Sequence, residues 1–591
     1  MRRSKSSPEK KGEKKEKKLD AEAVWNKYQK GLRFNGQIDL NETVRNNENF
    51  FIGKQWEGVK ANGLPQPVFN FLKRDTLYCV ASNTSDNVKI TATTLPAVKD
   101  RQKLQGTVDI INAVFDELFE HNKIAAKARE FMRNAAVDGD GCMYTFWDAD
   151  METGQDAKGG ICTELLENTR VHFGNPNDRH VQSQPYIIIA KRKLVEDVKD
   201  MAEENGVSEG EREMIRPDTD DTQSLMDSYT DDKCTLLLYL WRDKKSGTIH
   251  AMETTEHCVV REKWDLNIKH YPLIWMNWDY VQDCYHGQAM ITGLLTNQMF
   301  VNKFFALTMI SQMHTAFPRT VYDKTRVKHW SNAVGAAIGI EGGNTRDVAS
   351  IIEPAQQSPQ VHQLIASVID YTNSFLGATD AALGNTRPDN TSAIIALQRA
   401  SSVPMELTKQ NLYDAIEDLG MIYLDFIGEY YGKRYVEMPL DQVPEEMLSG
   451  ELKDFAAESG MLPAGTTVPV LFDFKTIKDL PMRLKLDVGA SSYWSEMSSI
   501  QTMENLLMQG KIDIVQFLER IPDQNVPMKE ELISEIKQQQ AMMAQMAPMP
   551  EEPSAGGGGE LTPTVPMPEG QGYGQLQRAI NATGEVPAGI V

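Results

Sequence analysis

The chain has 591 residues, of which 41% are hydrophobic and 25% are charged, a composition typical of a soluble globular protein with several domains. Its six cysteines lie far apart without a CxxC pair, which argues against a zinc site and favours buried thiols in a reducing compartment. The formal net charge of −21 disfavours a tight, nonspecific grip on duplex DNA.

Charge is unevenly distributed along the chain. Residues 1–20 form a Lys/Glu-rich arm, which we expect to be disordered and to serve as a solvated tail or an interaction arm. Residues 196–232 hold fourteen acidic and three basic side chains, and we expect a helical start followed by an exposed excursion. The stretch "DTDDTQSLMDSY" in this segment lacks the Gly and Glu of a calcium loop, which favours solvated acid.

No segment is predicted to span a membrane. The N-terminus lacks the apolar core of a signal peptide. Residues 284–302 carry no formal charge, but they contain one His, two Gln and two Asn, too many polar groups for one span. We therefore expect a protein of the cytoplasm.

The pattern of the first 150 residues is mostly helical. The expected aromatic core anchors are Trp25, Tyr28, Phe34, Phe50, Phe51 and Trp56. Residues 68–85 are predicted to form a helix whose inward side chains are Phe71, Leu72, Leu77 and Val80. A short strand at 87–96 and one helical run over Asp100–Val137 follow. A tight turn at Asp138–Gly141 then precedes a strand at 142–150.

Strand patterns dominate the next part of the chain. Apolar runs at 185–194, 234–243 and 247–260 predict three strands. The last two flank the turn sequence "KKSG", which predicts that they pair as a hairpin.

Three helices are predicted between residues 289 and 430. The first covers Ala289–Met313, and short strands and turns follow it at 317–354. The second carries the inward stripe Val361, Ile365, Val368, Thr372 and Phe375. The third runs from about residue 391 to 430, with the stripe Leu412, Ile416, Leu419, Tyr423 and Phe426. Pro404 removes a backbone donor within this helix and predicts a kink there.

The C-terminal part combines one strand with two helices. Residues 468–477 predict a strand, and residues 496–521 and 528–546 predict helices. Residues 548–591 are rich in Pro and Gly, which predicts disorder.

No catalytic motif was found. The glycine-framed loop at Gly377–Gly384 carries Asn385 where a phosphate-binding loop needs Lys, and no Walker, GxSxG, HExxH or GxGxxG pattern occurs. The histidine pairs His172/His180 and His250/His257 have no ligand spacing, so scattered core or surface histidines explain them best. An Asp/Glu nuclease centre stays open as an alternative.

The layout resembles the portal proteins of tailed bacteriophages. The segment "YPLIWMNWDYVQDCYHGQAMITGLLTNQMFVNKFF" is similar to the portal pattern of an apolar strand, a turn at Tyr285-His286-Gly287 and a helix bearing Gln298 and Asn302. The helix, short insert, helix, loop and kinked helix from 289 to 430 resemble the portal stem, clip, stem, tunnel loop and tunnel helix. "GDGCMYTFWDAD" and its neighbouring strands resemble the wing.

The resemblance implies an α+β, mainly helical fold with wing, stem, clip and crown regions, assembled as a ring-shaped homo-oligomer. The implied regions are a basic arm (1–20), a wing (21–286), stem helix 1 (287–316), a clip (317–358), stem helix 2 (359–376), a tunnel loop (377–391), a kinked tunnel helix (392–432), a wing return (433–495), a helical crown (496–547) and a Pro/Gly-rich tail (548–591).

The resemblance also implies a function without catalysis, cofactor or metal. Portal proteins form a dodecameric channel at one capsid vertex through which double-stranded DNA is packaged and ejected. They dock terminase and then tail adaptors, and contact major capsid and scaffold proteins, with assembly in the host cytoplasm. The alternatives are another non-catalytic virion protein, capsid- or tail-associated, and a terminase- or nuclease-type enzyme.

The resemblance assigns site residues by region. The tunnel-loop residues facing DNA are Gly377, Thr379, Asp380, Gly384, Asn385, Thr386, Arg387, Asp389 and Asn390. Arg387 is the only cation of that loop, which suits a low-affinity collar around moving DNA. Lys303 lies on the stem and Pro404 at the tunnel-helix kink. The clip cations Arg319, Lys324, Arg326, Lys328 and Arg346 either contact terminase or adaptors or form a solvated patch.

Overall fold

The computed structural model describes most of the chain between residues 20 and 521. The described residues are 20–60, 63, 65–86, 88–94, 101–155, 157–219, 232–316, 319–331, 338–352, 360–377, 403–439, 467–479, 482–488, 500, 503–521, 529, 532–533 and 536–537. The expected arm, the tail, most of the tunnel loop and much of the crown lie outside them. Residues 1–513 form one compact unit and residues 514–591 a second.

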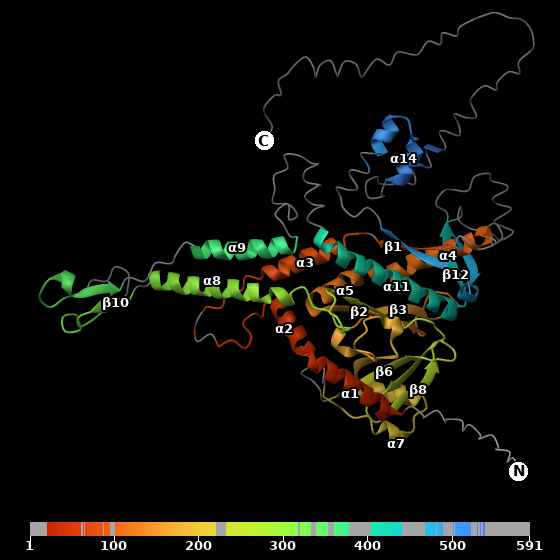
Figure 1. The fold of residues 1–591 in the computed structure, drawn as a ribbon, viewed down its shortest axis with the longest axis horizontal. Helices are drawn as coiled ribbons and strands as arrows, with labels where there is room; N and C mark the ends of the chain where they lie inside the picture. Colours follow the sequence, from red (N-terminus) through yellow and green to blue (C-terminus); the bar gives the residue numbers. More distant parts are fainter. Residues whose placement is uncertain are drawn as a thin grey trace, which may run out of the picture. The chain divides into compact units, whose positions relative to one another are not determined.

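Helices and strands are mixed, as the sequence predicts (Figure 1). The helices are α1 Ala21–Gln37, α2 Leu40–Ile52, α3 Phe71–Asn83, α4 Arg101–His121, α5 Ile124–Asp138, α6 Val195–Glu204, α7 Glu209–Arg212, α8 Leu295–Ala316, α9 Gln360–Phe375, α11 Glu406–Tyr430 and α14 Ile514–Arg520. The helical start of the acidic segment is confirmed by α6, while residues 220–231 lie outside the described ranges.

The strands of the first unit form five antiparallel sheets or ribbons among the described residues. The strands are β1 Val88–Thr94, β2 Asp140–Asp148, β3 Gly160–Leu165, β4 Val171–Phe173, β5 Tyr186–Leu194, β6 Lys233–Arg242, β7 Ile249–Thr254, β8 Val259–Asp265, β9 Leu273–Asn277, β10 Arg319–Tyr322, β11 Ala349–Ile352, β12 Lys433–Pro439, β13 Thr467–Asp473 and β14 Met482–Val488.

The larger sheets order as β4-β5-β6-β7-β8 and β3-β2-β9. The predicted hairpin across "KKSG" is confirmed by the antiparallel β6–β7 pair. The single strand expected at 247–260 is instead two strands, β7 and β8, which pair with each other. Three two-stranded ribbons, β1-β14, β10-β11 and β12-β13, complete the set.

Several predicted boundaries differ from the structure for local reasons. The helical run over Asp100–Val137 is split into α4 and α5 by Lys123, whose φ of 51° ends the first helix. The turn predicted at Asp138–Gly141 is shorter, because Gly139 (φ 101°) caps α5 and β2 already begins at Asp140. The predicted helix 496–521 is interrupted at Gly510 (φ 64°), since a left-handed residue cannot continue a helix.

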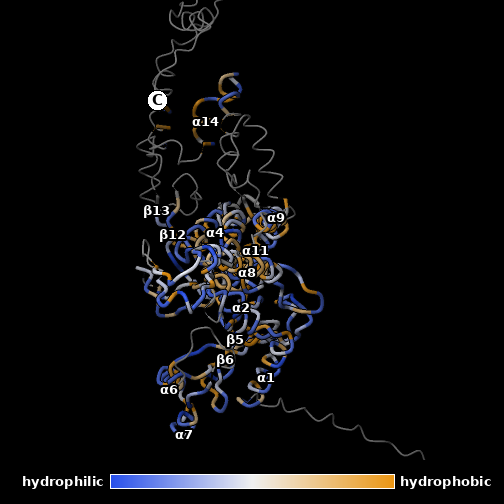
Figure 2. Tube along the Cα trace, turned by 90° about the vertical axis from the view of Figure 1, so that its left-hand side faces the viewer, coloured by the Kyte–Doolittle hydropathy of each residue, from blue (hydrophilic) through white to orange (hydrophobic). Residues whose placement is uncertain are grey.

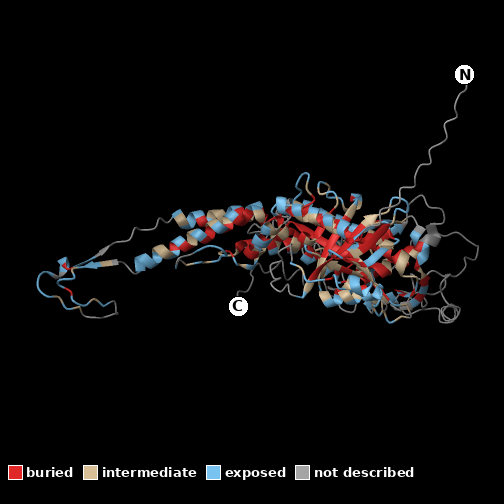
Figure 3. Ribbon diagram, turned by 90° about the horizontal axis from the view of Figure 1, so that it is seen from below, coloured by how far each residue is buried: buried red, intermediate tan, exposed pale blue. Residues whose placement is uncertain are grey.

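Helix α11 lies at the centre of the main core. Its predicted stripe is confirmed, because Leu412, Ile416, Leu419, Tyr423 and Phe426 are all buried. Figure 3 shows the neighbouring strands buried in the same region, and Figure 2 shows hydrophobic segments around α4, α8 and α11. The inward face predicted for α3 is confirmed except at Leu77, which is 48% exposed because α3 buries only one side.

The aromatic anchors expected in the first two helices are only partly confirmed. Tyr28 and Phe50 are buried, whereas Trp25, Phe34, Phe51 and Trp56 are half-buried. Tyr28 packs in a small cluster with β5 and β6 residues, which fixes α1 on the five-stranded sheet.

Candidate functional site

The base of α8 is held by two buried amides. Gln298 donates from Nε2 to the Phe69 carbonyl at 2.7 Å and to Asn302 Oδ1 at 3.0 Å. Asn302 Oδ1 in turn accepts from the Phe69 backbone N–H at 3.2 Å. The Phe69 ring stacks on Phe305 with centroids 4.0 Å apart. The Gln and Asn that the sequence singles out therefore anchor α8 to the segment before α3.

Helices α8 and α9 run side by side (Figure 1). Asn297 Nδ2 donates to Thr372 Oγ1 at 3.0 Å across the pair. Helix α8 begins at Leu295, later than the predicted Ala289, because residues 292–294 form a 3-10 turn. In the predicted α9 stripe, Ile365 and Thr372 are buried, whereas Phe375 is 76% exposed, so the inward assignment of Phe375 is wrong for a single chain.

The exposed surface of this helix pair is apolar and almost uncharged. Lys303 and Asp370 are the only Lys, Arg, Asp or Glu residues in α8 and α9, and Lys303 is exposed. Large apolar side chains that face solvent are Leu307, Met309, Met313, Leu364, Tyr371 and Phe375. A cleft of about 700 Å³ lies beside Tyr371 and Phe375, between α8, α9 and the start of α11. Such a surface is unusual for a monomer and typical of a contact face.

The predicted clip contains a small hairpin built from β10 and β11. Val327 and Val348 are buried beneath it, and the rings of Tyr322 and Trp330 stack at 5.1 Å. Arg326 lies 3.6 Å from Asp323, and Lys328 forms an ion pair with Glu341.

Two further clip cations differ from Arg326 and Lys328. Lys324 and Arg346 are exposed, and neither has a carboxylate within 4 Å among the described residues. Arg319 occupies the first position of β10, opposite Ile352. The clip thus presents two locally paired and two solvent-facing cations.

Most residues of the predicted tunnel loop fall outside the part of the chain that the structure describes. Gly377 ends α9 with φ 72°, and its N–H bonds to the Ser374 carbonyl. The other predicted loop residues, Thr379 to Asn390, lie outside the described part of the chain. Pro404 sits in a 3-10 turn, Val403–Met405, directly before α11. The first half of the predicted long helix falls on residues before 403, which are also outside it.

A buried polar cluster, which sequence reasoning missed, ties the turn before α8 to the sheets. The Asp140 side chain is fully buried and accepts four hydrogen bonds. His286 Nδ1, Asn277 Nδ2 and the Gly287 N–H each lie 2.7 Å from it. Asn168 Nδ2 completes the set at 3.2 Å. The sequence predicts only turns at the "GDG" and "YHG" stretches, yet the two stretches meet here.

Gly287 is required at this junction by lack of space. A Cβ at this position would lie 2.7 Å from Asn277 Cβ and 2.8 Å from the Asp279 carbonyl oxygen. The carbonyl oxygen of Gly287 would likewise lie 2.7 Å from a Cβ on Gly139. Two backbones therefore touch directly, and α8 starts from a fixed point.

The candidate histidines prove unremarkable as ligands. His172 is buried with no hydrogen-bond partner for either ring nitrogen among the described residues, and burial lowers its pKa to about 3. His250 lies 4.0 Å from Asp243 and 3.9 Å from Asp265. Across the described ranges, no group of three His, Cys, Asp or Glu is arranged to hold a metal ion.

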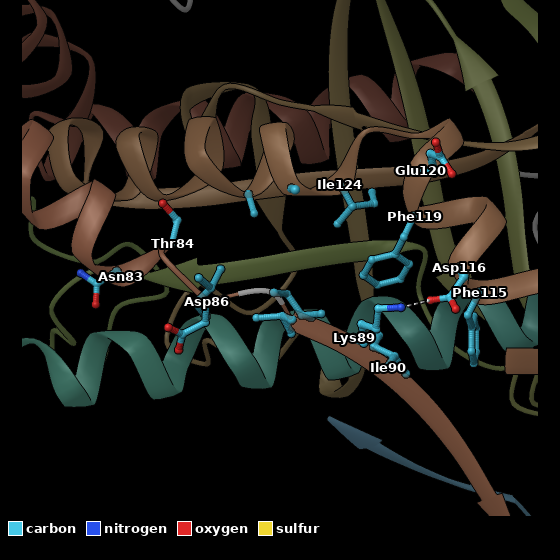
Figure 4. A pocket seen from close by; sticks show the side chains of 15 residues that line it. Asn83, Thr84, Asp86, Lys89, Ile90, Phe115, Asp116, Phe119, Glu120 and Ile124 are labelled. Atoms are coloured by element: carbon cyan, nitrogen blue, oxygen red, sulfur yellow. Dashed lines mark ion pairs between the residues drawn. The ribbon is translucent and has the colours of Figure 1, made fainter. Parts of the chain in front are cut away.

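A cavity of about 350 Å³ lies between α3, β1, α4, α5 and α11 (Figure 4). Its walls are apolar, with Phe119 and Ile124 facing inward, and its edge carries the Lys89–Asp116 ion pair at 3.6 Å. Asp86 forms an ion pair with Lys409 Nζ at 2.6 Å and accepts a hydrogen bond from the Tyr413 hydroxyl. The cavity therefore suits an apolar group. The carboxylate of Asp86 in its lining is already bonded to Lys409 and Tyr413.

No helix within the described residues is both long enough and apolar enough to cross a bilayer.

Part of the chain is similar to a known protein family. A search of the curated proteins finds no match. A family model described as phage P22-like portal protein matches residues 177–437. The matched segment contains the five-stranded sheet from β5 onward, the Asp140 partners of the 277–287 turn, α8, the β10–β11 hairpin, α9 and α11. These are the elements on which the sequence resemblance rests, and the match over them supports a phage portal protein.

Proposed function

We propose that the chain assembles into a ring-shaped homo-oligomer, a dodecamer, at one capsid vertex, and that double-stranded DNA passes through its axis during packaging and ejection. Terminase docks on it first and tail adaptors follow, with contacts to major capsid and scaffold proteins made during assembly in the host cytoplasm. The family match supports an oligomeric capsid component that works with DNA and has a structural rather than catalytic role.

The observation that carries the proposal is the nearly uncharged surface of α8 and α9. A channel wall that neutralised many phosphates would release counterions and bind the duplex tightly, with log K changing by about 0.9 per log unit of salt for each contact. One lysine per chain avoids such trapping. We assign α8 and α9 to the stem, the β10–β11 hairpin to the clip and α11 to the tunnel helix.

The proposal is tested by the assembly state. Negative-stain microscopy of the purified chain should show rings of about twelve subunits with an axial hole, as expected for cyclic homo-oligomers with heterologous contacts. A protein that stays monomeric at every concentration contradicts the proposal.

Lys303→Glu should weaken the association of DNA with assembled rings. The substitution replaces a ring of isolated positive charges by negative ones. The slope of log K for DNA binding against log salt concentration should therefore fall by the equivalent of about one phosphate contact for each engaged subunit. Binding of duplex DNA to purified rings over a salt series measures this. Lys244→Glu, an exposed change of the same charge in the β6–β7 turn, is the control and should leave the slope unchanged.

The solvent-facing clip cations should steer an acidic partner. Lys324→Glu combined with Arg346→Glu is expected to slow terminase docking several-fold at low salt, while ring formation is unchanged. Arg326→Glu should act less on docking and more on the clip itself, because Arg326 faces Asp323. Association rates measured at two ionic strengths separate the two effects; equal docking rates for all variants would contradict steering.

A further inference from the structure

Arg434 is a buried cation held only by neutral groups. It lies on β12 and is 6% exposed. Its Nε donates to the Tyr431 carbonyl at 3.1 Å. Its Nη2 donates to the carbonyls of Lys158 and Gly159 at 3.0 and 2.8 Å. No carboxylate lies within 4 Å of the guanidinium, and no acceptor reaches Nη1, among the described residues.

Two aromatic rings flank the same guanidinium. Its central carbon lies 4.4 Å from the centre of the Tyr431 ring and 5.3 Å from that of Trp147. Burial lowers the pKa of Arg434, although the nearby Tyr431 and Glu117 act in the opposite direction. Carbonyls and rings compensate the lost hydration of a charge only in part, and buried charges in proteins are normally paired.

Arg434 lines a cavity of about 190 Å³. The inner walls are apolar, formed in part by Val114, Leu118 and Phe474. Glu117 and Glu152 also border the cavity, but both are solvent-exposed, so water and salt screen their repulsion of an anion. The site therefore combines a charged donor that has no acceptor at Nη1 among the described residues with apolar side chains beside it.

The rim of this cavity is rigid and partly apolar. Gln155 clamps the backbone of Tyr435, donating to its carbonyl and accepting from its N–H, both at 2.9 Å. Tyr435 and its cross-strand neighbour Leu471 are 52% and 53% exposed. Exposed Tyr and Leu beside a buried Arg form the pattern of a protein-contact site rather than a solvated surface.

We propose that this cavity receives the carboxylate of an Asp or Glu side chain from a second copy of the chain, with its aliphatic stem against the apolar side chains and its oxygens on Arg434. The choice of a second copy rests on the proposed ring, in which each subunit presents a different face to each neighbour. The chain is rich in carboxylates, with 83 Asp and Glu against 62 Lys and Arg, which provides suitable groups.

The test uses butyrate, which mimics a Glu side chain, on the unassembled full chain. Calorimetric titration should show saturable binding of one butyrate per chain, and no binding of butyramide, its neutral analogue of nearly equal shape. Arg434→Met should weaken butyrate binding by about tenfold or more, as expected for loss of a charge-assisted hydrogen bond. Arg261→Met removes an exposed Arg that also stacks on a Trp ring, and should change nothing.

The possible outcomes distinguish a failure of the carboxylate site from a failure of the proposed ring. Butyrate that binds no better than butyramide to the wild-type chain overturns the carboxylate site, even if Arg434→Met fails to fold. Assembled rings should not bind butyrate, because a neighbouring carboxylate occupies the cavity. Equal binding by free chains and rings overturns the second copy as its source. A chain that never forms rings still reports on the site itself.

Discussion

Replacing Asp140 by Ala should lower the free energy of unfolding of the first unit by about 3–5 kcal/mol. The substitution leaves His286, Asn277 and the Gly287 N–H buried without their shared acceptor, and each unmet donor costs about 1–3 kcal/mol. Thermal and urea unfolding followed by far-UV circular dichroism measure the loss.

Hydrogen exchange of backbone amides shows where in the chain the Asp140→Ala substitution acts. Hydrogen exchange should show the loss of protection first in the 277–287 turn, where the bonds to Asp140 converge. Asp150→Ala is the matched control, since Asp150 is an exposed acid just beyond β2, and its effect should stay within about 0.5 kcal/mol. Equal stability of the Asp140 and Asp150 variants would show that the cluster is not a structural anchor.

Tyr371→Ser combined with Phe375→Ser should prevent ring assembly while leaving the monomer folded. Both side chains are 76% exposed in the single chain, so their removal costs the monomer little. If each is buried at a subunit contact, it contributes about 2 kcal/mol there. Loss of both weakens each contact by about 4 kcal/mol, or roughly a thousandfold in association constant.

Sedimentation velocity across a concentration series measures this effect. Leu194→Ser changes another exposed apolar residue, 46% exposed at the end of β5; it is the control and should assemble normally. Rings formed by the double variant at wild-type concentration would place the subunit contact elsewhere than on α9.

Much of the fold follows from local sequence patterns, because the spacing of apolar residues along a helix or strand indicates which of its faces is buried. The α11 stripe and the β6–β7 hairpin are both of this kind, since Leu412 to Phe426 repeat with helical spacing and "KKSG" marks its turn. Boundaries were less predictable where one residue adopts a left-handed conformation. Lys123 divides α4 from α5 in this way, and because it is not a glycine, the sequence does not indicate its left-handed conformation.

The parts of the candidate site that sequence reasoning missed depend on distant contacts. Asp140 precedes Asn277 by 137 residues and His286 by 146, and nothing in either segment indicates that they meet. Phe375 has a core-like spacing but an exposed position, at the last residue of α9. The unpaired state of Arg434 likewise depends on β12 folding against the 158–159 segment.

The pairing of β1 with β14 sets the order in which the chain can be completed. Val88 aligns with Val488, and Thr91 Oγ1 bonds to the carbonyl of Lys485, 394 residues later. Gly420 of α11 packs against Ile90 and Leu484 of the same ribbon, with no room for a side chain. This closure waits until residue 488 has left the ribosome, so a polypeptide that ends before β14 lacks the β1–β14 ribbon.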